Sequence, residues 1–363
     1  MTEPDGNLKS NTNVSRRRLL KIVGGFSALG VIAYLTEASQ KSKTIQRVKK
    51  VIAKLPNPTK KLPAPPTDPA KNIPGLTKLI TPNSDFFRID TAFNIPNIDS
   101  SSWKLEITGM VKKPITLSYQ ELLQRPLFEL DYTLSCVSNP VGGTLIGNAR
   151  WLGVRLDDLI NEAQPLTRAD QILSSSDDGF SAGFPLSVLD GRDAMIAIGM
   201  NGEALTAEHG YPARLIVPGL YGYVSATKWV TKIELTRFDI KQGYWIEQGW
   251  SVLAPIKMQS RIDTPSFDTK PGLTKIAGVA WAPNVGVGAV QVHIDNKWQK
   301  ATLGPVLAKT TWRQWWLDWE ATKGDHVLSV RAINTKGEVQ PERIKGVLPD
   351  GAEGWHTVTI TVQ

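Results

Sequence analysis

The stretch Leu134-Ser-Cys-Val-Ser-Asn-Pro-Val-Gly-Gly143 contains the only cysteine of the 363-residue chain, Cys136. Residues 129–135 predict a strand that ends at the cysteine, and the Asn, Pro and Gly residues after it predict a turn. A lone cysteine cannot form an internal disulfide. One interpretation is a small buried apolar residue. The other is a metal ligand, because a thiolate at the tip of a strand, beside a loop of backbone N–H groups, is well placed to bind a soft metal ion.

Three further motifs follow this stretch. They are Gly147-Asn-Ala-Arg-Trp-Leu-Gly-Val154, His209-Gly-Tyr-Pro-Ala-Arg-Leu-Ile-Val-Pro-Gly219 and Lys228-Trp229. With Leu134-Ser-Cys136 before them, in this order, the chain resembles the sulfite oxidase family of molybdenum–molybdopterin enzymes from about Phe86 to its C-terminus. The resemblance implies molybdenum–molybdopterin as the cofactor, with Cys136 as its one protein ligand. The sequence contains no Cys-x-x-Cys-His motif, and we expect no haem.

The same resemblance implies cofactor contacts from His209, Arg214 and Lys228. The planar fork of Arg214 suits the pterin phosphate, and a guanidinium beside a buried apolar run needs a partner. The loop between these residues carries hydroxyl groups that can line the pterin, and Ser225 is the contact we expect there. The structural alternatives are a turn histidine at position 209 and a solvated strand lysine at position 228.

Three more site residues follow from the resemblance. Arg88 matches the arginine of the family's aromatic-Arg-Asn-His segment, whereas Ile89 and Asp90 replace its Asn and His. Asp178 lies in a segment similar to the acidic one beside the cofactor, and its alternative is a turn aspartate. Tyr244 corresponds to the family's active-site tyrosine. We therefore expect catalytic roles for Cys136, Arg88 and Tyr244, and cofactor binding by Asp178.

The residues after Cys136 depart from the family pattern, Cys-x-Gly-Asn-Arg-Arg, whose arginines bind the sulfite dianion. Here no basic residue occurs before Arg150. The loss of one such clamp costs an anion about 1.5–3 kcal/mol of binding free energy. Sulfite is therefore one candidate substrate among small sulfur compounds. Arg88 and Arg150 are the candidates for completing an anion site.

Charge is concentrated at the N-terminus. The first 61 residues contain thirteen Lys and Arg against three Asp and Glu, a net charge of +10, whereas the whole chain carries +8. The pI of about 9.4 therefore describes the leader and not the body. This distribution argues against a nucleic-acid partner.

The segment Ser15-Arg-Arg-Arg-Leu-Leu-Lys21 fits the twin-arginine export pattern, and an apolar run at 22–36 follows it. The run is short for a membrane span, which needs about 20 residues. We expect residues 1–38 to be a twin-arginine signal or membrane anchor. Residues 39–82, basic and then proline-rich, predict an extended linker. The enzyme would then be exported to the periplasm or cell surface, with an N-terminal membrane anchor as the alternative.

Residues 83–262 predict an α+β catalytic domain. Strands are expected at 103–109, 194–199 and 213–218, and helices at 118–124, with a capping box, and at 156–163. Motifs for a dinucleotide site, a phosphate-binding loop, a zinc site or a serine hydrolase are absent from the sequence.

Residues 272–363 predict an all-β domain. They contain alternating strands divided by Gly, Asn and Asp turns, and Trp355-His-Thr-Val-Thr-Ile-Thr-Val362 shows the period of two of a half-buried strand. The pattern suggests an immunoglobulin-like sandwich, which in the family mediates homodimer formation. Outward tryptophans of Trp312-Arg-Gln-Trp-Trp-Leu-Asp-Trp319 are expected at a subunit contact or against the catalytic domain.

Three functions remain open. The first is a sulfite-oxidase-like oxidase that transfers an oxygen atom to a sulfur substrate, and the second is a reductase of sulfoxides of the methionine sulfoxide type. Both need a separate electron carrier, a cytochrome or a quinone-linked partner. The third is a non-enzymatic cell-surface binding protein built on the immunoglobulin-like domain, which the retained Cys136, His209 and Arg214 argue against.

Overall fold

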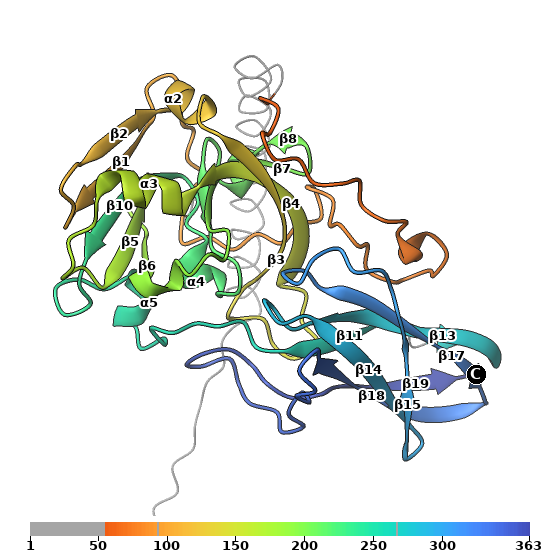
Figure 1. Cartoon of the computed structure of the whole chain (residues 1–363). Helices are drawn as coiled ribbons and strands as arrows, with labels where there is room; N and C mark the ends of the chain where they lie inside the picture. The colour runs from red at the N-terminus through yellow and green to blue at the C-terminus, as the bar shows by residue number, and fades with distance from the viewer. Residues whose placement is uncertain (1–54, 93, 266–267) are drawn as a thin grey trace, which may run out of the picture. The chain divides into compact units, whose positions relative to one another are not determined.

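The computed structural model describes residues 55–363 except 93 and 266–267. The twin-arginine segment, the apolar run and the whole of the expected signal or anchor at 1–38 lie outside the described residues. Within the described part, no helix is long and apolar enough to cross a membrane. The described residues belong to one compact unit (Figure 1).

Two sheets, one of antiparallel strands and one mixed, and several short helices build the first part of this unit. The strands are β1 (Lys104–Gly109), β2 (Ile115–Ser118), β3 (Leu127–Ser135), β4 (Ile146–Arg155), β5 (Gln171–Ser176), β6 (Ser181–Pro185), β7 (Met195–Met200), β8 (Glu203–Ala204), β9 (Arg214–Ile216) and β10 (Val230–Thr236). The helices are η1 (Pro69–Lys71), α2 (Tyr119–Leu123), α3 (Leu156–Ala163), η2 (Leu186–Val188), η3 (Ala207–His209), α4 (Gly222–Ser225) and α5 (Tyr244–Glu247).

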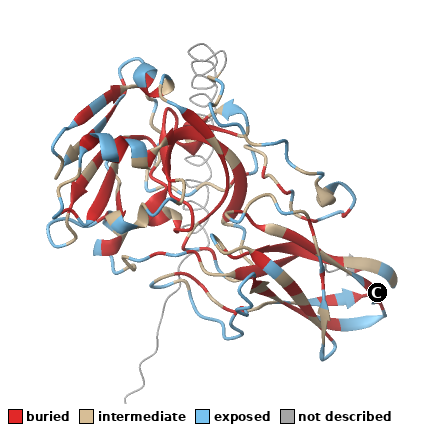
Figure 2. Ribbon diagram, in the orientation of Figure 1, coloured by how far each residue is buried: buried red, intermediate tan, exposed pale blue. Residues whose placement is uncertain are grey.

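The sheet that carries the cysteine has the order β3-β4-β7-β8, with β9 paired to β7. β3 and β4 are antiparallel in an unbroken register from Leu127 opposite Val154 to Ser135 opposite Ile146. Most residues of both strands are buried (Figure 2). The strand end at Ser135, directly before Cys136, is therefore held by a long ladder of backbone hydrogen bonds.

The second sheet has the order β2-β1-β10-β5-β6. Its helix α2 begins at the capping box predicted from the sequence: Ser118 Oγ accepts from Glu121 N, and Glu121 Oε2 accepts from Ser118 N. Helix α3 occupies the predicted residues, 156–163, and buries one apolar face that includes Leu159 and Ile160. The α+β class predicted for this part of the chain is confirmed.

The C-terminal part is a β-sandwich, as predicted. Its strands are β11 (Gln259–Thr264), β12 (Asp268–Thr269), β13 (Gly272–Trp281), β14 (Val287–Ile294), β15 (Lys297–Lys300), β16 (Thr302–Leu303), β17 (Arg313–Ala321), β18 (Gly324–Asn334) and β19 (His356–Val362). They form two sheets, β11-β13-β17-β16 and β12-β19-β18-β14-β15. The buried hydrophobic core of these strands includes Val290, Trp315 and Val330. Because β11 pairs with β13, the sandwich begins at Gln259, before the boundary predicted at 272.

Two tryptophans contact other parts of the same chain: Trp312, directly before β17, and Trp316, within β17. Trp316 packs with Ile73 and Leu76, and Trp312 Nε1 donates to Leu79 O at 2.9 Å. Of the two roles expected for outward tryptophans, these contacts match packing against the rest of the chain. The homodimer stays a prediction.

The described part of the expected linker, residues 55–82, is not a free spacer. Thr59 N donates to Leu127 O at 2.8 Å, Glu129 N donates to Lys60 O at 3.1 Å, and Lys60 pairs in parallel with Phe128. Farther along, Leu79 is buried. Helix here is limited to the short η1 (Pro69–Lys71), and backbone groups of Thr59 and Lys60 bond to the edge of β3. The folded body therefore starts well before residue 83.

Candidate active site

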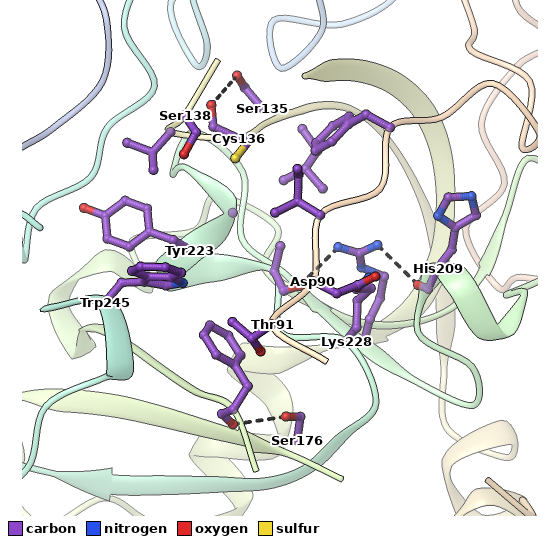
Figure 3. Close-up of a pocket in the computed structure, with 18 of the residues that line it drawn as sticks. Asp90, Thr91, Ser135, Cys136, Ser138, Ser176, His209, Tyr223, Lys228 and Trp245 are labelled. Carbon is purple, nitrogen blue, oxygen red and sulfur yellow. Dashed lines mark hydrogen bonds and ion pairs between the residues drawn. The ribbon is translucent and has the colours of Figure 1, made fainter. Parts of the chain in front are cut away.

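A cavity of about 940 Å³, part of it open to solvent, lies beside the end of β3. Figure 3 shows the side chain of Cys136 at this cavity, with Tyr223 and Trp245 on one side and His209 on the other. The remaining lining comes from several elements. In full it comprises Phe86, Phe87, Ile89, Asp90, Thr91, Leu134, Ser135, Cys136, Val137, Ser138, Ser176, Asp178, Phe180, His209, Arg214, Gly222, Tyr223, Ala226, Lys228, Trp229, Trp245 and Trp250.

Cys136 begins a closed turn. Its backbone N donates to Leu145 O at 2.9 Å and its carbonyl accepts from Asn139 N at 3.1 Å, while Asn139 Oδ1 accepts from Leu145 N at 2.8 Å. Burial raises the pKa of the Cys136 thiol, and hydrogen bonds from the backbone and side chain of Ser138 act against that shift. A bound metal cation would favour the thiolate. The chemistry of this position thus fits a metal ligand.

The β-sandwich braces the cysteine turn. Arg261 of β11 donates from Nη1 to Gly143 O at 2.8 Å, from Nε to Asp263 Oδ1 at 2.6 Å, and from Nη2 to Thr77 Oγ1 at 2.8 Å. Gly142 lies against the ring of His356, so closely that a Cβ at this glycine would meet it at 2.3 Å. The Gly-Gly pair of the opening motif is thereby explained in part: position 142, at φ +76°, has no room for a side chain.

The fixed cation of the cavity is Arg214 on β9. Its guanidinium is buried, donates to His209 O at 3.2 Å and Ala226 O at 3.1 Å, and lies 5.1 Å from the ring centroid of Trp151. Arg214 Nε has no hydrogen-bond partner among the described residues. Burial lowers the pKa of Arg214 to about 9. A buried guanidinium bonded to neutral carbonyls needs an anion, so this position fits the phosphate of a pterin cofactor.

Lys228 and Arg88 share one carboxylate, that of Asp90. The Lys228 ammonium contacts Asp90 Oδ1 and donates to Glu208 O at 3.1 Å, and Arg88 Nε donates to Asp90 Oδ2. Burial, with a smaller contribution from the charge of Arg88, lowers the pKa of Lys228 to about 7. Asp90, which replaces a family histidine, thus holds two of the expected site cations. Lys228 lines the cavity and Arg88 does not.

His209 closes the far side of the cavity. Its Nε2 lies 2.9 Å from Asn83 O, and its ring meets that of Phe86 edge to face at 5.7 Å. Burial lowers the pKa of His209, which favours the neutral ring. Because a carbonyl can only accept, the neutral ring carries its proton on Nε2.

The other predicted site residues differ in position. Asp178 lines the cavity and accepts from Phe180 N at 3.3 Å. Ser225 does not line it, since its buried hydroxyl bonds to Leu220 O and Tyr221 O within its own turn. Tyr244 is 45% exposed and outside the lining, which its neighbour Trp245 joins instead. The catalytic and cofactor roles of these residues stay predictions.

Arg150, the alternative anion-site candidate, is engaged elsewhere. It forms a bidentate pair with Asp131, both distances 2.8 Å, and Nη1 donates to Pro63 O. It does not line the cavity. The expectation that Arg150 completes an anion site beside Cys136 is therefore wrong, because its guanidinium fastens the N-terminal segment to β3 and β4.

The sequence did not reveal the aromatic lining. The cavity is lined by Phe87, Trp245 and Trp250. The sequence pointed toward Trp245 only through its position next to the predicted Tyr244. In the part of the chain that the structure describes, no group of three or more His, Cys, Asp and Glu side chains can hold a metal ion.

Comparisons with known proteins agree with this site. Residues 92–245 match the family model of the oxidoreductase molybdopterin binding domain. The chain is 31% identical to the uncharacterized oxidoreductase YuiH of Bacillus subtilis over 42% of its own length and 74% of that protein. It is 28% identical to the mitochondrial sulfite oxidase of Rattus norvegicus, over 78% of this chain and 62% of that enzyme. The chain thus spans less than two thirds of the mitochondrial enzyme.

A solved structure shares the fold. The sulfane dehydrogenase SoxCD of Paracoccus pantotrophus superposes with a TM-score of 0.68 at 23% identity, covering 79% of this chain and 84% of that one. Fold and site together define a molybdopterin oxidoreductase. The chain belongs to the sulfite oxidase family. The family and the enzyme class predicted from the sequence are confirmed, and the non-enzymatic alternative falls away.

Proposed function

We propose that this protein is an exported enzyme that transfers an oxygen atom at a sulfur centre, with molybdenum–molybdopterin bound in the cavity beside Cys136. The observation that carries the proposal is the pairing, in one cavity, of the chain's only thiol with a buried arginine bonded only to carbonyls. One group suits a soft metal and the other a phosphate.

The roles of the chain's own residues follow from their contacts. Cys136 would supply the thiolate ligand, and the turn closed by Asn139 and braced by Arg261 fixes its position. Arg214 and Lys228 would hold the phosphate, and neutral His209, whose Nε2–H is engaged by Asn83 O, would offer Nδ1 as a hydrogen-bond acceptor at the same end. The bound cofactor supplies two-electron oxygen-atom transfer. The aromatic residues around the mouth would reduce the access of water to the reacting atom once a substrate covers them.

Both reaction directions remain, oxidation of a sulfur compound and reduction of a sulfoxide. The sulfite oxidase relatives support the first, as does the C-terminal sandwich, which sulfoxide-repair members lack. The reductase direction is favoured by a specific observation: the lining residues near Cys136, namely Ser135, Val137 and Ser138, carry no positive charge. Electrons would pass to or from a separate cytochrome or quinone-linked carrier.

Export is proposed on the sequence Ser15-Arg-Arg-Arg-Leu-Leu-Lys21. It would place the enzyme in the periplasm or at the cell surface, with retention of the apolar run as a membrane anchor being the alternative. A homodimer formed through the β-sandwich is proposed from the family resemblance alone.

The proposal is tested by metal analysis and by the single thiol. Protein purified from a molybdopterin-producing host should contain about one molybdenum per chain, and Cys136→Ser should abolish dye-linked turnover of sulfite or methionine sulfoxide without loss of folding. Because Cys136 is the only cysteine, alkylation with iodoacetamide reports on it alone. The thiol should react in cofactor-free protein and be protected in the loaded enzyme. Full activity of the serine variant would exclude the ligand role.

A further inference from the structure

The cavity has two sides of different chemistry. His209, Arg214 and Lys228 lie at one end, where the proposed function places the cofactor phosphate. The opposite side is an aromatic wall, defined here as Phe180, Tyr223, Trp245 and Trp250. Figure 3 shows Tyr223 and Trp245 close together on this side of Cys136. The side of the cavity left for a substrate is therefore apolar.

The aromatic wall is a continuous cluster. Tyr223 and Trp250 have ring centroids 5.7 Å apart, and Trp250 and Trp245 have centroids 6.4 Å apart. Tyr244 joins Trp245 at 5.0 Å and Phe180 at 6.3 Å. Trp245 and Trp250 are only half-buried, so part of their apolar surface remains in contact with water at the cavity. Such surface is stabilised when an apolar ligand covers it.

A second apolar group lies at the same cavity. Ile89 lines it and is 51% exposed. Isolated exposed apolar residues are ordinary on protein surfaces, but here one adds to a cluster of aromatic rings around a cavity. The mouth thus presents side chains suited to contact a carbon substituent.

The wall offers no positive charge to an anion. The Tyr223 hydroxyl donates to Ser251 O, and burial raises the pKa of Tyr223, so the phenol stays neutral. The charged group beside the wall is the Asp178 carboxylate, which accepts from Phe180 N. The two cations of the lining, Arg214 and Lys228, lie at the end where the cofactor phosphate is proposed, and Lys228 is already engaged by Asp90. A dianion placed between Cys136 and the wall would therefore lie beside the Asp178 carboxylate.

We infer that the aromatic wall is a subsite for an uncharged apolar substituent, and that the substrate is a neutral organic sulfur compound that carries an aryl or bulky alkyl group. The inference rests on the proposed function insofar as the reacting atom is sulfur. The sulfur would face Cys136 and the apolar group would cover Trp245 and Trp250. Burial of a phenyl ring there should strengthen binding about ten- to hundred-fold.

Two sulfoxides that differ in one substituent test this subsite. Methyl phenyl sulfoxide and dimethyl sulfoxide share the reacting group, and their dissociation constants for the molybdenum-loaded enzyme are measured by calorimetry. The phenyl compound should bind at least about tenfold more tightly, with no dependence on salt. Trp250→Ala and Trp245→Ala should each remove most of this preference. Trp298→Ala, a half-buried tryptophan of β15 outside the cavity, is the matched control and should retain it.

Equal affinities of the wild-type enzyme for the two sulfoxides would overturn the inference, and this comparison needs no variant to fold. A phenyl preference that survives both tryptophan substitutions would overturn it as well. Turnover is measured separately with sulfite and both sulfoxides. An enzyme that turns over none of them contradicts the proposed function, whereas the ratio of dissociation constants still decides the subsite.

Discussion

Replacement of Arg261 by Met should loosen the turn that carries Cys136. The Arg261 and Asp263 side chains are 9% and 6% exposed, and their ion pair at 2.6 Å is nearly buried. Removal of one partner of a buried pair costs about 3–5 kcal/mol of unfolding free energy, because the other charge stays buried. After the substitution, Asp263 retains only the bond from Thr77 N at 3.1 Å. The substitution also removes the hydrogen bond to Gly143 O. A hydrogen bond from a charged donor contributes about 1.5–3 kcal/mol, so its loss weakens the turn itself.

Two readouts separate global from local effects. Urea unfolding measures the total loss, expected at about 4 kcal/mol. The rate of iodoacetamide alkylation of Cys136 in folded, cofactor-free protein measures opening of the turn, and it should rise about tenfold or more. Arg313→Met is the matched control: this sandwich arginine, like Arg261, donates to backbone carbonyl oxygen, in its case Gly304 O and Val287 O. The control should leave the alkylation rate unchanged. An unchanged rate in Arg261→Met would refute the claim that Arg261 positions the cysteine turn.

Three further predictions follow from charge and burial. Burial lowers the pKa of His356, which faces Arg261 and Asp263 and whose Nδ1 accepts from Ile262 N at 3.0 Å. The unfolded state therefore binds a proton near pH 6.5 that the folded state does not. The free energy of unfolding should fall as the pH drops below about 6.5, by at most about 1.4 kcal/mol per pH unit. In His356→Gln the fall should be less steep. For sulfite, Ile89→Arg should lower a high, salt-sensitive KM, whereas Ile240→Arg, equally exposed but outside the lining, should not; a tight, salt-insensitive wild-type KM would contradict the missing anion clamp. Replacement of Arg16 and Arg17 by Lys should trap folded enzyme in the cytoplasm, as measured by cell fractionation, and unimpaired export would indicate a plain basic anchor.

The choice of Ile89 for the added arginine comes from the structure. Asn139 and Pro140 follow the cysteine closely, as the arginines of the family pattern do. Asn139 is buried and its Oδ1 holds Leu145 N, so substitution there would open the turn. Pro140 is exposed and outside the cavity. Ile89 lines the cavity without a hydrogen bond to lose.

Local signals in the sequence predicted local structure well. The Ser118 and Glu121 spacing gave a helix start, and the alternation in 355–362 gave a strand, because each depends on neighbours a few residues apart. The cavity brings Cys136, His209, Arg214 and Lys228 together as predicted from their motifs. These positions could be predicted because each residue lies at or beside the end of a strand or short helix, and the motif that contains the residue also contains that end.

Contacts between distant residues were not predictable in this way. Asp68 accepts from Leu79 N, Ala70 N and Gln314 Nε2, the last 246 residues away. Composition described this segment as a proline-rich spacer, which is correct for its backbone conformation and not for its packing. Likewise, spacing alone cannot decide between adjacent residues of one helical turn. The sequence predicts Tyr244 as the site residue, whereas its neighbour Trp245 lines the cavity.

The site depends on the completed fold. This dependence predicts an order in which folding comes first, cofactor binding second and export last. Arg214 reaches the cavity only when β9 has paired with β7, and Cys136 is positioned by Arg261 from the sandwich, more than a hundred residues later in the chain. The buried guanidinium of Arg214 is unfavourably placed until an anion matches it, and the half-buried Cys136 thiol stays protonated until a metal cation binds. Cofactor binding would therefore follow folding of both parts and stabilise them together. A cofactor made in the cytoplasm then requires a route that carries folded protein, which is the property for which the twin-arginine motif is proposed here.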